Sequence, residues 1–274
     1  MSGGIRVDQS RRLERYLEIE DSLKRRLMDA GSARLRFNKP YVRASDIAGQ
    51  YYCERKVEMV HLRGRVETET KRQGSEGHES LQAESIEIPR TELLEEIFSG
   101  EAVIVHELPL LAEHRGVVLA GQPDAVIFKG GLPVALLEVK FSNSPYPYRS
   151  YHAQARVYGR ILDGAGFDTS DLYYVIAVAP RESRGDGALF GRVIDALREC
   201  GSGEASFEVD GVHVYVYEYS QPSAVKDIDY ALEYWTGSRE AAPVDNPAKC
   251  SHCEYLEECR DKMEEAASDK TPFS

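Results

Sequence analysis

Hydrophobic positions recur at helical spacing from the start of the chain. Residues 8–29 place Leu13, Leu17 and Leu27 among dense charges, which predicts a helix with one apolar side. Cys53 falls in a second predicted helix, for which Ser45 or Asp46 is the expected N-cap. By the same reasoning, further helices are expected over 65–85, 91–99, 148–166, 186–199 and 223–236.

The pattern changes in the second third of the chain, where apolar segments rich in valine, leucine and isoleucine alternate with turn residues. Three such segments predict a meander of consecutive strands over 102–112, 116–128 and 132–141. Gly130 and Gly131 form a strong hairpin signal between the last two strands. Two later strands are expected over 172–180 and 212–220. This order of elements predicts a mixed α/β fold, with a central sheet flanked by helices.

Composition adds limits on the class of protein. The chain has 274 residues and is 42% hydrophobic, enough for one large domain or a domain with an accessory lobe. It has neither a signal-peptide pattern at the N-terminus nor the roughly 20 consecutive apolar residues that span a bilayer, so we expect a cytoplasmic protein without a membrane partner. The net charge of −12 argues against indiscriminate coating of nucleic acid, but is compatible with a local basic channel.

Charged residues interrupt the apolar strands at three positions. Asp124 is expected on one strand of the hairpin, while Glu138 and Lys140 lie two residues apart on the next and so share a face. Burying such charges costs several kcal/mol unless they are paired or bound to a metal. Either they form an exposed pair on a half-solvated strand end, or they belong to a functional site.

The spacing of these residues favours a site. Pro123-Asp124, thirteen residues and then Glu-Val-Lys give the pattern Pro-Asp…Glu-x-Lys. Two carboxylates on adjacent strands can share Mg²⁺ or Mn²⁺, which activates water and neutralises charge on a phosphate. A lysine beside them can stabilise the transition state. His78, in a polar segment after Gly74 and Gly77, is either a surface residue or a third metal ligand.

Two groups of polar and aromatic residues follow the lysine strand. Gln154 and Tyr158 are four residues apart and share one face of a predicted helix, from which they could contact a phosphate, a base or Lys140. Tyr158 could equally be an ordinary core residue. The segment 143–152 combines three tyrosines with Arg149, which suits either base stacking or a proline-rich loop.

Three cysteines near the C-terminus follow the spacing Cys-x2-Cys-x5-Cys, at Cys250, Cys253 and Cys259. In a reducing compartment, such a group indicates a metal or redox site rather than disulfides. Structural zinc and a [4Fe–4S] cluster both fit three thiolates plus one more ligand. The candidates for that fourth ligand are Cys53, Cys200, His252 and His61.

Taken in order, these motifs resemble the RecB-like nucleases of the PD-(D/E)XK superfamily, and most specifically the CRISPR-associated Cas-four-type exonucleases. The similarity runs over residues 45–260. It implies a restriction-endonuclease-like core with an iron–sulfur-clamped helical lobe. Residues 1–44 would then be an N-terminal helical extension, and 261–274 a tail without fixed structure.

The resemblance also implies a role for each motif. His78, Asp124, Glu138 and the carbonyl of Val139 would bind Mg²⁺ or Mn²⁺, Lys140 would be catalytic, and Gln154 and Tyr158 would support substrate binding. A [4Fe–4S] cluster would be held by four thiolates, those of Cys53, Cys250, Cys253 and Cys259.

The implied activity is an exonuclease on single-stranded DNA, with a CRISPR integrase as a partner in spacer acquisition. The alternatives are a repair or flap endonuclease with the same site, and a non-catalytic assembly module or zinc-stabilised DNA-binding protein. The oligomeric state is left open.

Overall fold

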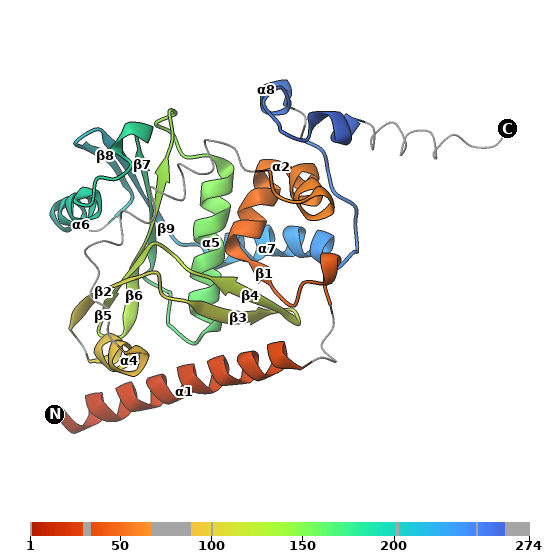
Figure 1. Cartoon of the computed structure of the whole chain (residues 1–274). Coiled ribbons are helices and arrows are strands. Elements are labelled where there is room, and N and C mark those ends of the chain that lie inside the picture. The colour runs from red at the N-terminus through yellow and green to blue at the C-terminus, as the bar shows by residue number, and fades with distance from the viewer. Residues whose placement is uncertain are drawn as a thin grey trace.

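The computed structural model describes residues 2–29, 34–66, 89–99, 101–200, 203–244 and 246–260. Figure 1 shows two sheets around a central helix, α5 (Arg149–Gly164), with the long helix α1 (Ser2–Met28) lying across one end. The chain is a mixed α/β protein whose mixed sheets are flanked by helices, as the sequence predicts. Within the described ranges, none of the helices combines the length and the apolar character needed to cross a bilayer.

The larger sheet has six strands in the order β2-β5-β6-β7-β9-β8. β6 and β7 run parallel, whereas the other neighbouring pairs are antiparallel. A parallel pair needs a crossover connection, and α5 provides it. The strands are β2 (Ala102–His106), β5 (Ala125–Lys129), β6 (Leu132–Phe141), β7 (Tyr173–Ala179), β8 (Ala205–Val209) and β9 (Val212–Glu218).

Side chains alternate between the two faces of this sheet, and this alternation places the charged residues of β6. Leu136 packs in the core on the α5 side, whereas Leu137 and Val139 pack on the side of α6 (Leu189–Cys200). Because successive side chains point to opposite faces, Glu138 and Lys140 share the face of Leu136. They therefore lie under α5.

A smaller sheet packs beside α5 and is covered by α1. Its order is β1-β4-β3, formed by β1 (Val42–Arg43), β3 (Leu110–His114) and β4 (Val117–Gly121). Tyr16 and Leu23 of α1 are almost fully buried, and the Arg12 guanidinium donates to the carbonyl of Gly131 at 2.7 Å. The segment expected to be an N-terminal extension is thus packed on the body of the protein.

The other helices complete the layers around α5. α2 and α7 pack together with α5, and α4 lies beside α1 (Figure 1). Their bounds are α2 (Ala44–Arg63), α4 (Arg90–Phe98), α7 (Gln221–Trp235) and α8 (Pro247–Cys250), with short 3₁₀ turns η1 (Arg36–Asn38) and η2 (Arg181–Ser183).

The expected three-strand meander is wrong. The segment 102–112 divides into β2 of the larger sheet and β3 of the smaller one, and 116–128 divides into β4 and β5. Pro109 and Pro123 lie at the two divisions, where a residue without an N–H cannot continue a ladder. The Gly130–Gly131 hairpin is confirmed, with positive φ at both glycines.

Several finer expectations also differ from the structure. Asp124 lies immediately before β5 rather than on a strand, and β8 was not predicted. The N-cap of α2 is Arg43, two positions before Ser45, and the Asp46 carboxylate accepts the N–H of Arg43 at 2.9 Å. Of the helix expected over 65–85, the part from residue 67 lies outside the described residues, as does the expected tail 261–274.

Candidate active site and cysteine cavity

Three predicted site residues come together where β5 and β6 meet. The backbone N–H of Val139 donates to Oδ2 of Asp124 at 2.7 Å, which holds this carboxylate against β6. The Lys140 ammonium contacts Oε1 of Glu138 on the same strand face. Asp124, Glu138 and Lys140 therefore form one cluster of charge at the surface of the sheet that α5 covers.

Burial decides between the two readings of the strand charges. Glu138 is 1% exposed, so it does not belong to a solvated strand end. Burial acts to lower the pKa of Lys140, but the charges of Glu138 and Asp124 outweigh it and raise the pKa above its usual value. Lys140 is consequently a firmly protonated ammonium group within a carboxylate cluster.

α5 supplies two further predicted residues to this cluster. Oε1 of Gln154 accepts a hydrogen bond from Lys140 Nζ at 3.1 Å, and Nε2 of Gln154 donates to the Tyr158 hydroxyl at 2.9 Å. Burial raises the pKa of Tyr158 well above 10, and the charge of Glu138 raises it further. Lys140, Gln154 and Tyr158 thus form a connected row in which each side chain orients the next.

The structure adds two residues that the sequence analysis did not identify. The charge of Glu107 also raises the pKa of Tyr158, and its carboxylate accepts a hydrogen bond from Gln122 Nε2 at 3.3 Å. The ring of Tyr151 lies 5.6 Å from the Lys140 ammonium. Glu107 carried the same signal as Glu138, an isolated carboxylate within an apolar run, whereas nothing in the sequence set Tyr151 apart from its neighbouring tyrosines.

The oxygen ligands present suit a hard divalent cation. Two carboxylates beside a strand are ligands that Mg²⁺ and Mn²⁺ prefer, and backbone carbonyls can complete such a set. His78, the predicted third side-chain ligand, lies outside the described residues. In the part of the chain that is described, no three His, Cys, Asp or Glu side chains form a group that could hold a metal ion, so the metal set stays a prediction.

The four cysteines of the predicted cluster line one cavity of about 40 Å³. Cys53 interrupts α2 with an extended backbone conformation, at φ −170°, which divides the helix where it meets the C-terminal segment. Burial raises the pKa of the Cys259 thiol, and the nearby Cys53, Cys253 and Cys250 raise it further. Four thiols around one cavity suit iron or zinc by donor type. Within the described residues, however, the four thiols are not arranged as a group that could hold a metal ion.

The other candidates for a fourth ligand lie elsewhere. Cys200 is exposed at the end of α6. The ring of His61 stacks on Phe37 with centroids 4.4 Å apart, and the ring of His252 is within hydrogen-bond distance of Ser251. Cys53 is thus the candidate that shares the cavity with the three C-terminal cysteines.

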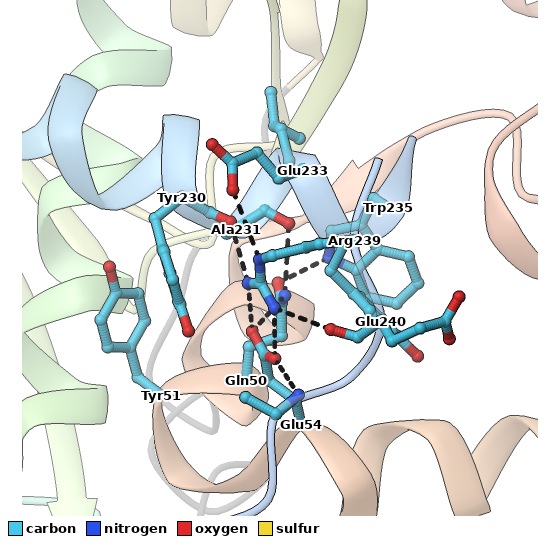
Figure 2. A network of polar contacts seen from close by, with 12 residues as sticks. Gln50, Tyr51, Glu54, Tyr230, Ala231, Glu233, Trp235, Arg239 and Glu240 are labelled. Carbon is cyan, nitrogen blue, oxygen red and sulfur yellow. Dashed lines mark hydrogen bonds and ion pairs between the residues drawn. The ribbon is translucent and has the colours of Figure 1, made fainter. Parts of the chain in front are cut away.

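A buried polar network surrounds Glu54, the residue that follows Cys53 in α2 (Figure 2). Arg239 places both terminal nitrogens on the Glu54 carboxylate, and the N–H of Ala242 donates to the same carboxylate at 2.7 Å. Trp235 Nε1 donates to Gln50 at 2.6 Å. These contacts fasten the chain after α7 to α2, and so bring the C-terminal cysteines back towards Cys53.

Comparisons with known proteins show a short sequence similarity and a structural similarity. No family model matches the chain. A segment of 44 residues is 36% identical to the mitochondrial exonuclease V of Candida dubliniensis, and this match covers 16% of the present chain and 7% of that protein. The crystal structure of a protein named SSO0001 aligns with 90% of this chain and 97% of its own, at 14% identity and a TM-score of 0.47. The matched segment is a small part of that exonuclease.

Proposed function

We propose that this protein is a metal-dependent deoxyribonuclease with a RecB-like PD-(D/E)XK core, which removes nucleotides from the ends of single-stranded DNA. The observation that supports the proposal most directly is the convergence of Asp124, Glu138 and Lys140 under Gln154 and Tyr158. Binding alone gives no reason to bury a carboxylate and an ammonium together in a strand. The partial match to an exonuclease supports the same class.

Each residue has a defined part in the proposed reaction. Asp124, Glu138, the carbonyl of Val139 and His78 would hold Mg²⁺ or Mn²⁺. When bound, such a cation neutralises charge that develops on the phosphate and makes water a stronger nucleophile. The N–H of Val139 fixes the Asp124 carboxylate against β6, which supports this assignment.

Lys140 supplies the positive charge that belongs to the protein itself. Its raised pKa keeps it protonated, so it can stabilise the negative oxygen atoms of the phosphate in the transition state. Gln154 fixes the direction of the ammonium group, and Tyr158 fixes Gln154. A preoriented donor of this kind needs little rearrangement during the reaction.

We also propose that Cys53, Cys250, Cys253 and Cys259 hold a [4Fe–4S] cluster with a structural role. Their shared cavity lies between α2 and the C-terminal segment. These two segments also meet where the Tyr255 hydroxyl donates to the carbonyl of Gly64, a residue 191 positions earlier in the chain. Bound metal would link these distant segments and stabilise the fold. Zinc is the alternative, and visible absorption with iron and zinc analysis of anaerobically purified protein distinguishes the two.

The nuclease is tested with a single-stranded oligonucleotide labelled at the 5′ end or the 3′ end, with Mg²⁺, Mn²⁺ or EDTA. We expect metal-dependent shortening from one end, and no cleavage of a circular single strand. Cleavage of the circle would instead indicate the endonuclease alternative. Glu138→Ala and Lys140→Ala should abolish cleavage, whereas Lys129→Ala, an exposed lysine on β5, should not. Full activity of either site variant would overturn the assignment of the site.

A role in CRISPR spacer acquisition, with an integrase as partner, is the most specific form of the proposal. It rests on the family resemblance of the motifs alone. Co-purification of the protein with a CRISPR integrase, and changed spacer lengths in cells carrying Lys140→Ala, would support it.

A further inference from the structure

A groove of about 690 Å³ lies between α1, the smaller sheet and the start of α2. We call it the α1 groove. Its walls include Glu20, Lys24, Tyr41, Arg43, Arg90 and Tyr158, contributed by α1, by the chain entering α2, by α4 and by α5. Figure 1 shows α1 crossing beneath β3 and β4 with α4 beside it. Glu20 and Lys24 of α1 line the groove.

The charge of the α1 groove is opposite to that of the protein. The chain has a net charge of −12, yet the described residues that line the groove include three cations and one carboxylate, that of Glu20. Arg90 and Lys24 both pair with this carboxylate, Lys24 at 3.2 Å, and so share a single negative charge. Arg43 contacts the hydroxyl of Tyr41 at 3.2 Å, and the nearby carboxylate of Asp46 is already paired with Lys39. A surplus of positive charge remains for an anionic ligand.

The groove shares Tyr158 with the candidate active site. Tyr158 lines the groove and is also the last member of the row that runs through Gln154 to Lys140. Gln122, another lining residue, precedes Asp124 by two positions. A polymer that lies in the groove therefore passes beside the end of the row that leads to Lys140.

The size and the aromatic content of the groove favour a single strand. Its volume falls in the range of about 300–1,000 Å³ that is usual for small-ligand sites, which accommodates a short stretch of one strand but not a duplex. The Arg43 guanidinium lies 5.7 Å from the centre of the Tyr41 ring, and such aromatic and guanidinium surfaces stack on unpaired bases. Cations at intervals along the groove can follow the phosphates.

We propose that the α1 groove binds the nucleotides of a single DNA strand next to the phosphate that is cut. Lys24, Arg43 and Arg90 contact its phosphates, and Tyr41 with Arg43 supports a base. This inference rests on the proposed nuclease function and extends it, because it makes the N-terminal helix a part of the substrate-binding surface.

The test measures DNA binding separately from cleavage. The full-length protein is titrated in EDTA against a fluorescent single-stranded oligonucleotide, and a duplex of the same sequence is measured in parallel. Lys24→Glu and Arg43→Glu change exposed residues of the groove. Arg25→Glu is the matched control, because Arg25 is an exposed neighbour on the same helix and is not among the groove residues.

We expect each groove variant to bind the single strand about tenfold more weakly and to show a smaller dependence of binding on salt. Arg25→Glu should remain within about twofold of the wild type, since it makes the same change of net charge outside the groove. Thermal melting checks the fold, and Lys24→Ala and Arg43→Ala replace any glutamate variant that melts lower than the wild type.

The possible results separate this inference from the proposed function. If the wild type binds and cuts single strands while the groove variants bind as tightly as the Arg25 control, the groove assignment is wrong and the nuclease remains. Tighter binding of the duplex would overturn the assignment to a single strand. A wild-type protein that neither binds nor cuts DNA would overturn both.

Discussion

The Glu54 carboxylate accepts hydrogen bonds from both terminal nitrogens of the Arg239 guanidinium, at 2.5 and 2.6 Å, across 185 residues of sequence. Glu54 directly follows Cys53, and Arg239 begins the segment that leads to α8 and the C-terminal cysteines. A two-point contact between guanidinium and carboxylate fixes orientation as well as distance. The pair therefore holds the chain after α7 against α2, before that chain continues to the C-terminal cysteines.

Removal of this carboxylate should destabilise the protein strongly. Glu54→Ala leaves Arg239 and the N–H of Ala242 without their shared acceptor in a largely buried place. We expect the free energy of unfolding to fall by about 3 kcal/mol, as for other broken buried pairs. Urea denaturation measures this change.

A surface pair provides the control for that experiment. Asp195 and Arg198 contact each other at 2.9 Å, with side chains 70% and 67% exposed. Asp195→Ala should change the free energy of unfolding by less than about 0.5 kcal/mol, because exposed pairs contribute little. Equal effects of the two substitutions would show that the Glu54 pair does not carry the stability assigned to it.

The hydroxyl of Tyr158 should matter for rate rather than for fold. Tyr158→Phe removes the acceptor of the Gln154 amide, so Gln154 no longer holds Lys140 in one direction. We expect cleavage to slow by roughly tenfold or more, because small displacements of reacting groups reduce rates sharply. Single-turnover cleavage of a labelled single strand measures the change.

Tyr234→Phe is the matched control for Tyr158→Phe. Tyr234 is buried like Tyr158, and its hydroxyl has no hydrogen-bond partner among the described residues. Its loss should leave the cleavage rate within about twofold, since it has no contact to remove. A Tyr158→Phe protein as fast as this control would exclude the proposed orienting role.

Substitution of a cysteine in the cavity should affect colour and stability, whereas substitution of Cys200 should not. Cys250→Ala should yield colourless protein that melts at lower temperature, because the cluster loses one of its four proposed ligands. Cys200→Ala should keep both colour and melting temperature, since Cys200 is exposed on α6 and does not line the cysteine cavity. Visible absorption, iron content and a thermal melt are measured on protein purified without oxygen. A coloured and equally stable Cys250→Ala protein would remove the cluster assignment.

The elements with strong local signals were predictable from sequence. The Gly130–Gly131 turn, the amphipathic α5 and the alternating β9 each depend on residues close together in the chain, and the structure contains all three. The i, i+2 spacing of Glu138 and Lys140 likewise determined that they share a face. Local spacing therefore predicted that these two side chains lie together.

Features that depend on distant contacts were not predictable. The division of 102–112 and 116–128 between two sheets reflects pairing with strands far away in sequence, and Pro109 and Pro123 gave only a local hint. The packing of α1 on the smaller sheet depends on Tyr16 and Leu23, which look like any apolar helix positions. For the same reason, the α1 groove could not be seen from the N-terminal sequence.

Tyr158 packs so closely on Gly121 that a side chain at position 121 should displace it. A Cβ atom added at Gly121 would lie 2.8 Å from Tyr158 Cδ1 and 2.8 Å from Ile161 Cδ1, closer than packed carbon atoms tolerate. Gly121→Ala should therefore displace Tyr158, lower the free energy of unfolding by about 1–3 kcal/mol and slow cleavage.

Gly191→Ala is the matched control, since a Cβ atom there meets nothing within 4 Å. Because alanine favours the helix α6 more than glycine does, this change should stabilise the protein by roughly 0.5 kcal/mol. Thermal melting and single-strand cleavage of both variants measure these opposite effects. A Gly121→Ala protein as stable and active as Gly191→Ala would show that Tyr158 does not need the close packing that connects the groove to Lys140.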